Sequence, residues 1–220
     1  MNHAEHFRKE KYAFVEGLLP IEICNVATRY ALMQKETQFS PEDDDEAQVY
    51  MAHSKYGDTL METLLYFLHP VLENTLEMEL CPTYSYFRVY TPGDDLKRHK
   101  DRESCEISTT ITLGYNYNHE DPNYNWGMYV DPLSDKLDVA YDENGEFVSS
   151  NNKGVIYPQH AGDVIAYRGC DIEHWRDPFE GDEGSYQVQV FCHFIDKNGP
   201  FYPEWAYDKR PGLGYTGKDK

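Results

Sequence analysis

The sequence lacks paired cysteines, a long uninterrupted apolar run and the apolar segment of a signal peptide. Its cysteines number five, which is odd, and none stands in a C-x-x-C pair. A disulfide framework or a zinc ribbon is therefore not expected, and a reducing cytoplasm is the expected location. The longest apolar run, 60–80, is broken by Pro70 and several glutamates, so it does not predict a membrane span. Residues 1–14 lack the apolar segment of a signal peptide.

Positive charge is also scarce. The chain has 20 lysines and arginines against 39 acidic residues, which gives a net charge of -19. Because nucleic-acid binding depends on basic side chains that neutralise phosphates, a nucleic-acid partner is not expected. The acidic run 42–46 is interpreted as a solvated loop. Five basic residues nevertheless cluster, and either attract an anionic ligand or form a solvated face: Arg88, Lys97, Arg98, Lys100 and Arg102.

The first third of the chain predicts helices after one short strand. Residues 12–15 predict the strand, and Pro20 is suited to the first turn of a helix. A second helix is expected after Asp58, which can cap it, and is expected to end or kink at Pro70. The apolar stripes of the two helices are Ile23, Val26, Ala27 and Tyr30, and Leu60, Leu64 and Leu68.

From Cys81 onward the pattern changes to short strands. They are expected at 84–90, around 99–101, and at 107–113, 126–130, 154–157, 163–167, 172–175 and 186–194. Asp142–Gly145 predicts a hairpin turn. Helices followed by about eight strands indicate an α+β fold, a double-stranded β-helix (jelly roll) with N-terminal helices packed on one sheet. We expect one domain, 1–220, with a helical part at about 1–80, the jelly roll at about 81–196 and an irregular tail at 197–220.

The most informative motif is His99-Lys-Asp101, with His174 much later in the chain. Two imidazoles and one carboxylate can hold a divalent iron on one face and leave the opposite positions open. Side chains at i and i+2 of a strand project from the same face, so a strand bearing this motif would present two ligands together. A distant strand would then bring the third, His174.

The other histidines are interpreted as surface or structural residues. A second H-x-D, His119-Glu-Asp121, lies in a run of Asn, Asp, Pro and Gly that is typical of a loop. His160 and His193 stand in strand-like contexts and are interpreted as structural histidines of the core.

Several further motifs accompany the H-x-D in a fixed order: Arg88-Val-Tyr90, Pro92-Gly93, the β-branched strand 107–113, Trp126-Gly-Met-Tyr129, Ala161-Gly-Asp-Val-Ile-Ala-Tyr167 and His174. In this order they resemble the Fe(II)/2-oxoglutarate-dependent dioxygenases, most closely the prolyl-4-hydroxylase-like branch. The resemblance implies that His99, Asp101 and His174 bind iron. It also implies 2-oxoglutarate as cosubstrate, O₂, and hydroxylation of an unactivated C–H with release of succinate and CO₂. Ascorbate is a further candidate cofactor.

The sequence departs from this family at the cosubstrate anchor. The family usually has an arginine or lysine about ten residues after the distal histidine, but 183–187 contains no cation. Arg176 would share a face with His174 if both lie on one strand, so we predict that its guanidinium holds the distal carboxylate of 2-oxoglutarate. Tyr90 matches a family tyrosine that helps to hold the cosubstrate. Thr112 lies where a polar side chain often reaches the same carboxylate.

The resemblance suggests a peptide or small-molecule substrate, namely a peptidyl proline or an amino-acid-like compound. The insertion 114–153 is interpreted as a lid that sets specificity. Two alternatives stay open on the same jelly roll: a cupin-like metalloprotein that does not use 2-oxoglutarate, and a non-catalytic metal-binding module. Arg176 argues against the cupin-like alternative, because such proteins need no anchor for a distal carboxylate.

Overall fold

The computed structural model describes residues 2–38 and 52–215, so the acidic run 42–46 lies outside the described residues. Within these ranges the chain forms three α-helices: α1 (His3–Glu10), α2 (Ile21–Gln38) and α3 (Thr59–Leu76). It also forms ten strands: β1 (Tyr12–Val15), β2 (His53–Tyr56), β3 (Leu80–Tyr90), β4 (Leu96–His99), β5 (Ile107–Asn116), β6 (Met128–Asp131), β7 (Val155–Tyr157), β8 (Val164–Tyr167), β9 (Glu173–Arg176) and β10 (Tyr186–Asp196).

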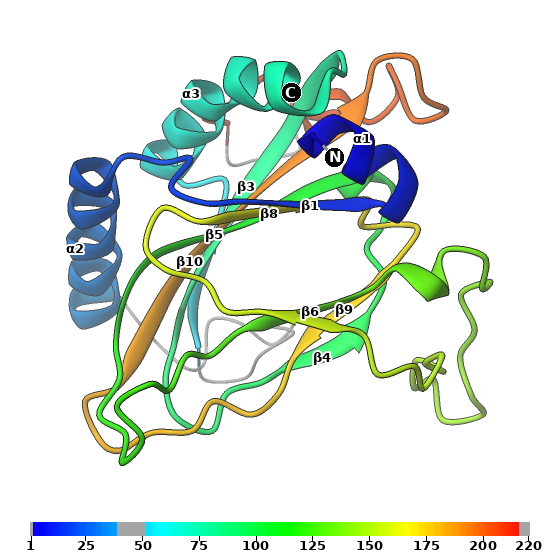
Figure 1. The fold of residues 1–220 in the computed structure, drawn as a ribbon. Coiled ribbons are helices and arrows are strands. Elements are labelled where there is room, and N and C mark those ends of the chain that lie inside the picture. The colour runs from blue at the N-terminus through cyan, green and yellow to red at the C-terminus, as the bar shows by residue number, and fades with distance from the viewer. Residues whose placement is uncertain (1, 39–51, 216–220) are drawn as a thin grey trace.

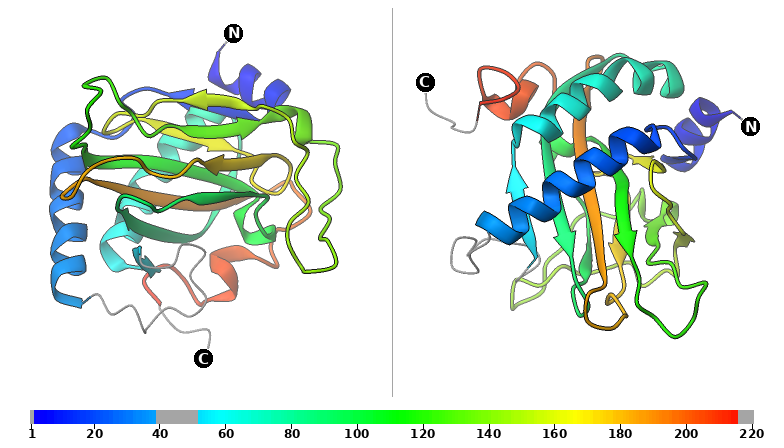
Figure 2. Two further views of the ribbon diagram at one scale, coloured as in Figure 1. Left: turned by 90° about the horizontal axis from the view of Figure 1, so that it is seen from below. Right: turned by 90° about the vertical axis from the view of Figure 1, so that its left-hand side faces the viewer.

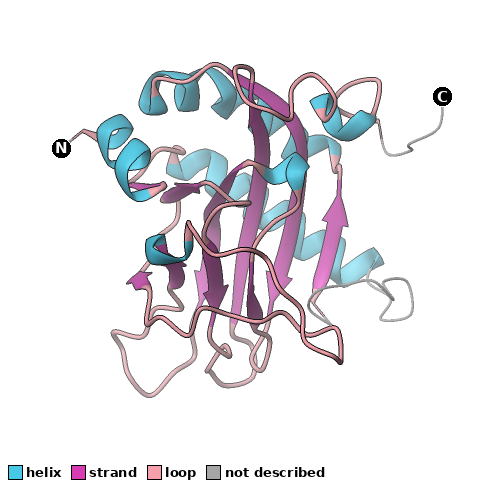
Figure 3. Ribbon diagram, turned by 90° about the vertical axis from the view of Figure 1, so that its right-hand side faces the viewer, coloured by secondary structure: helices cyan, strands magenta, loops and turns pink. Residues whose placement is uncertain are grey.

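The described strands form two antiparallel sheets that face each other (Figure 1). The larger sheet has the order β1-β8-β5-β10-β3-β2, and the smaller has the order β4-β9-β6-β7. The long strands of the larger sheet run side by side, and many of the connecting loops gather at one end of them (Figure 3). This is the predicted α+β jelly roll.

Helices α2 and α3 cover the outer face of the larger sheet, as predicted (Figure 2). The strands beneath them are buried on both faces, so alternate side chains have different neighbours. On β3, Phe87 and Val89 belong to the hydrophobic cluster under the helices, whereas Tyr86 and Arg88 line a cavity between the sheets. This alternation therefore separates the core of the fold from the interior where a ligand can bind.

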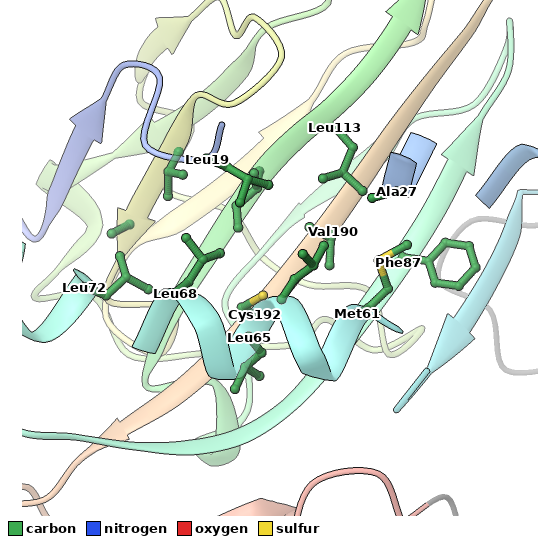
Figure 4. Close-up of a cluster of buried hydrophobic side chains, with 14 of the residues drawn as sticks. Leu19, Ala27, Met61, Leu65, Leu68, Leu72, Phe87, Leu113, Val190 and Cys192 are labelled. Carbon is green, nitrogen blue, oxygen red and sulfur yellow. The ribbon is translucent and has the colours of Figure 1, made fainter. Parts of the chain in front are cut away.

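Helix α3 packs on the sheet through residues of helical period. Its buried side chains include Met61, Leu65, Leu68 and Leu72, which lie against the strands in Figure 4. The side chain of Asp58 accepts hydrogen bonds from the first turn of the helix, which confirms the predicted cap.

Two predictions about the helices are wrong in detail. Of the two predicted outcomes at Pro70, an end or a kink of α3, the end is wrong, because the helix continues to Leu76. Pro70 is exposed, so water can hydrogen-bond the carbonyl group that the proline leaves without a donor. In α2, Val26 is 65% exposed, and the buried side is formed by Cys24, Ala27 and Ala31. The small residues allow the helix to approach the sheet closely.

Other elements were absent from the prediction or agree with it. Helix α1 and strand β2 were not predicted. The hairpin turn is confirmed, since the amide of Gly145 donates to the carbonyl of Asp142 and Gly145 has φ +79°. The tail is largely turns, yet buried Arg210 donates to Glu62 and to the carbonyl of Thr83, which attaches the tail to the body. All five cysteines are free. No helix in the described ranges has the length and apolar character to cross a bilayer.

Candidate metal centre

Three possible metal ligands meet between the two sheets, two of them on neighbouring strands of the smaller sheet. His99 is the last residue of β4 and pairs directly with His174 of β9. Asp101 lies beyond the end of β4, so the prediction that the whole H-x-D motif lies on a strand is wrong. Its amide donates to the carbonyl of Gly169 at 2.8 Å, and this loop contact orients the carboxylate in place of strand pairing.

The ligand atoms converge on one point. Oδ1 of Asp101 lies 3.5 Å from Nε2 of His99 and 3.5 Å from Nε2 of His174. Nδ1 of His99 is 2.6 Å from the carbonyl of Lys97, and Nδ1 of His174 is 3.2 Å from that of Ile172. A carbonyl can only accept, so each Nδ1 carries the proton and each Nε2 keeps a lone pair directed at Asp101. This arrangement suits a divalent metal ion.

The protonation of Asp101 and His99 also suits metal binding. Burial raises the pKa of Asp101, but the neighbouring His174 and His99 outweigh it and hold the pKa well below its usual range. Burial, with His174 beside it, lowers the pKa of His99. The carboxylate is thus ionised and His99 is neutral near pH 7, which are the forms that bind metal.

A further set of residues, which the sequence did not indicate, supports Asp101. Oγ of Ser108 donates to Oδ2 of Asp101 at 2.8 Å and lies 2.9 Å from Nδ1 of His193. Gly169 is required here, because a Cβ atom at this position would lie 2.3 Å from Oδ2 of Asp101. The interpretation of His193 as an ordinary core residue is wrong, since it lines the cavity at the ligands. No local pattern brings positions 101, 108 and 193 together.

The three ligands border a cavity of about 240 Å³ between the sheets. Its walls are rich in aromatic rings and contain one arginine. The lining residues are Tyr84, Tyr86, Arg88, Leu96, His99, Asp101, Tyr167, His174, Phe191 and His193. The second H-x-D motif is remote from any such cluster: His119 stacks on Tyr124 in a loop, and no group of possible ligands in the described residues includes it.

Arg176 follows His174 on β9 and is 1% exposed. Its Nη1 donates to the carbonyl of Trp126 at 2.5 Å and its Nη2 to Oε1 of Gln159 at 2.6 Å, whereas Nε has no hydrogen-bond partner. Burial lowers the pKa of this guanidinium. Among the described residues no carboxylate forms an ion pair with it. Arg176 lies outside the set that lines the cavity.

Tyr90 and Thr112, the other predicted cosubstrate contacts, are fully buried. The hydroxyl of Tyr90 accepts a hydrogen bond from Nη1 of Arg88 at 3.1 Å, and its ring packs on Trp126, the residue whose carbonyl Arg176 contacts. Oγ1 of Thr112 accepts from Nε2 of Gln189 at 2.9 Å. Tyr90 thus contacts Arg88 directly and Arg176 through Trp126, and Thr112 has a partner on β10 of the larger sheet.

The basic cluster 88–102 is largely engaged in internal contacts. Arg98 donates to Glu173 and to Asp131, both buried, and so joins the strands that carry His99 and His174. Lys100 donates to carbonyl groups of the 131–153 segment, and Arg102 pairs with Asp208. Arg88 is the member of this cluster that lines the cavity.

No protein-family model matches this chain, and no curated protein does either. Many solved structures do match it. The non-heme alpha ketoglutarate dependent epimerase SnoN from nogalamycin biosynthesis has a TM-score of 0.66 and 16% identity over 99% of this chain and 90% of its own. A Pseudomonas putida prolyl-4-hydroxylase has a TM-score of 0.60 and 13% identity over 88% and 97%. A Trichoplax adhaerens prolyl hydroxylase in complex with a hypoxia inducible factor peptide has a TM-score of 0.62 and 10% identity over 89% and 88%. The chain therefore has the jelly-roll fold of the Fe(II)/2-oxoglutarate oxygenases.

Proposed function

We propose that this protein is an Fe(II)- and 2-oxoglutarate-dependent oxygenase that hydroxylates an unactivated C–H of a peptidyl proline or an amino-acid-like substrate. One observation carries the proposal: the same barrel holds a His-Asp-His cluster with converging ligand atoms and a buried arginine without a carboxylate partner. The first feature fits iron, and the second fits the distal end of 2-oxoglutarate.

His99, Asp101 and His174 would hold the iron through two imidazole nitrogens and one carboxylate oxygen. Such a set occupies one face of the ion and leaves the other positions for cosubstrate and oxygen. When bound, iron and 2-oxoglutarate supply the oxidising chemistry, in which O₂ is consumed, one oxygen atom enters succinate and the other enters the substrate. Ser108 orients Asp101 through its hydrogen bond to Oδ2.

Arg176 is the proposed anchor for the distal carboxylate of 2-oxoglutarate. A buried guanidinium needs an anionic partner, and its unpaired Nε is a donor that a carboxylate would satisfy. Nε2 of Gln187, on β10, is a second buried donor without a partner. Tyr90 and Thr112 are proposed to assist. In a cupin-like protein or a non-catalytic module, no carboxylate of a cosubstrate would accept hydrogen bonds from these donors.

The first test is release of succinate. Purified protein with Fe(II), 2-oxoglutarate and O₂ is expected to form succinate slowly, and faster once a substrate is added. Succinate is measured by mass spectrometry, and hydroxylation by a gain of one oxygen in the substrate. The matched control omits Fe(II). Absence of succinate after careful metal reconstitution would favour the cupin-like protein or the binding module.

Acid is expected to weaken iron binding. Protonated imidazole cannot bind metal, so Fe(II) affinity should fall as the pH drops below the ordinary histidine pKa of about 6.5 toward pH 5. Burial lowers the pKa of His99, so its protonation requires a lower pH than that of an ordinary histidine. Asp101 stays ionised throughout, because its pKa is held well below its usual range. Anaerobic titration of Fe(II) at several pH values measures the effect; a constant affinity would contradict histidine ligation.

A further inference from the structure

Arg88, like Arg176, is a buried arginine between the two sheets, and it lies on the sheet opposite to Arg176. It is 3% exposed and lines the cavity together with the three proposed ligands. Its Nη1 donates to the hydroxyl of Tyr90, and its Nε has no hydrogen-bond partner. In residues 2–38 and 52–215 no carboxylate forms an ion pair with it. A buried guanidinium without a carboxylate partner would be stabilised by an anionic group of a bound ligand.

The charges of the loaded site leave Arg88 uncompensated. Under the proposed function, the charges of Fe(II), Asp101, dianionic 2-oxoglutarate and Arg176 cancel. Apart from Asp101, no side chain that lines the cavity carries a carboxylate, so the cavity wall supplies no further anion. Asp94 interacts electrostatically with Arg88, but its carboxylate accepts hydrogen bonds from Thr91 and forms no ion pair with the guanidinium. Arg88 therefore keeps unused donors for an anionic ligand.

The surroundings of Arg88 suit a small molecule that has one acidic end. Its guanidinium lies 5.2 Å from the centre of the Tyr86 ring. Tyr84 and Phe191 line the same cavity from the larger sheet. These rings can pack an apolar body while the guanidinium binds a carboxylate with two parallel hydrogen bonds.

We propose that Arg88 binds the carboxylate of the prime substrate, and that this substrate is a small free carboxylic acid, of which a free amino acid is the simplest kind. An internal residue of a peptide has no carboxylate to offer at its backbone, so it would leave Arg88 unpaired. The inference rests on the proposed function, in which Arg176 serves 2-oxoglutarate. It narrows that function from a peptide or an amino acid to a free acid.

Binding without turnover tests the inference. The protein is loaded with Mn(II) and 2-oxoglutarate under nitrogen, and the standard free L-amino acids are compared with their carboxamides by thermal shift and then by calorimetric titration. The amide keeps the shape of the acid but removes its charge. At least one acid is expected to bind ten- to a hundredfold more tightly than its amide, the range of a charge-assisted hydrogen bond, on the order of 1.5–3 kcal/mol. If no acid binds more tightly than its amide, the inference is wrong.

Arg88→Gln is expected to reduce this preference to within about threefold, because the neutral amide side chain loses the charge-assisted bonds. Arg29→Gln, a change at an exposed position of α2, is the control and should leave the preference intact. If Arg88→Gln weakens 2-oxoglutarate more than Arg176→Gln does, Arg88 is the cosubstrate anchor and the inference is overturned. Failure of the protein to bind 2-oxoglutarate at all would instead refute the proposed function. The comparison of acid and amide on the unaltered protein requires no variant to fold.

Discussion

Replacing His174 with alanine is expected to abolish turnover and to weaken Fe(II) binding by more than about a hundredfold, since changes to residues that only support a ligand already cost 10- to 100-fold. Nε2 of His174 is one of two imidazole nitrogens that lie 3.5 Å from Asp101. Without it, iron would keep two protein ligands, and the position that the imidazole held would fill with water. Succinate release and anaerobic Fe(II) titration measure the two effects.

The matched control is His119→Ala, which removes the histidine of the other H-x-D motif. His119 stacks on Tyr124 in a loop outside the metal centre, so its loss should leave Fe(II) affinity and succinate release within about twofold of the unaltered protein, as for an ordinary surface change. Circular dichroism and thermal denaturation would establish that both variants fold. Full activity in a folded His174→Ala variant would refute the metal assignment.

Arg176→Ala is expected to weaken 2-oxoglutarate binding at least ten- to a hundredfold. A charge-assisted hydrogen bond to a desolvated carboxylate contributes ~1.5–3 kcal/mol, and about 1.4 kcal/mol corresponds to a factor of ten in affinity. Arg176→Lys should recover only part of the loss, because an ammonium group cannot reproduce the planar fork of the guanidinium. The measurement is the dissociation constant of 2-oxoglutarate with Mn(II) in place of iron.

Metal affinity in the absence of cosubstrate serves as the internal control for both Arg176 variants. Arg176 is not one of the three proposed metal ligands, so the metal affinity should change little. The truncation also leaves Oε1 of Gln159 and the carbonyl of Trp126 without a donor, so some loss of thermal stability is expected as well. An unchanged affinity for 2-oxoglutarate would refute the anchor. Arg88 would then become the candidate anchor for 2-oxoglutarate, and the assignment of the metal ligands would be unaffected.

Much of the fold was accessible from the sequence because it is encoded locally. Residue types that favour strands predicted the strands, as at 84–90, and the capping carboxylate of Asp58 predicted the start of α3. The trio His99, Asp101 and His174 followed from residue type and from the order of the surrounding motifs, and the structure brings their ligand atoms within 4.8 Å of one another. The i+2 relation of His174 and Arg176 holds because both lie on β9.

The environment of these residues was decided by tertiary structure alone. Asp101 owes its orientation to Ser108 and Gly169, which different segments of the chain contribute. His193 resembled a core histidine in sequence, and only the pairing of β10 with β5 sets it beside Ser108. Arg88 appeared to be one member of a basic cluster, yet its register on β3 turns it into the cavity, while Arg98 and Arg102 form ion pairs elsewhere. Residue type and local period determine which groups can act, whereas burial and the presence or absence of a partner depend on contacts between segments distant in the chain.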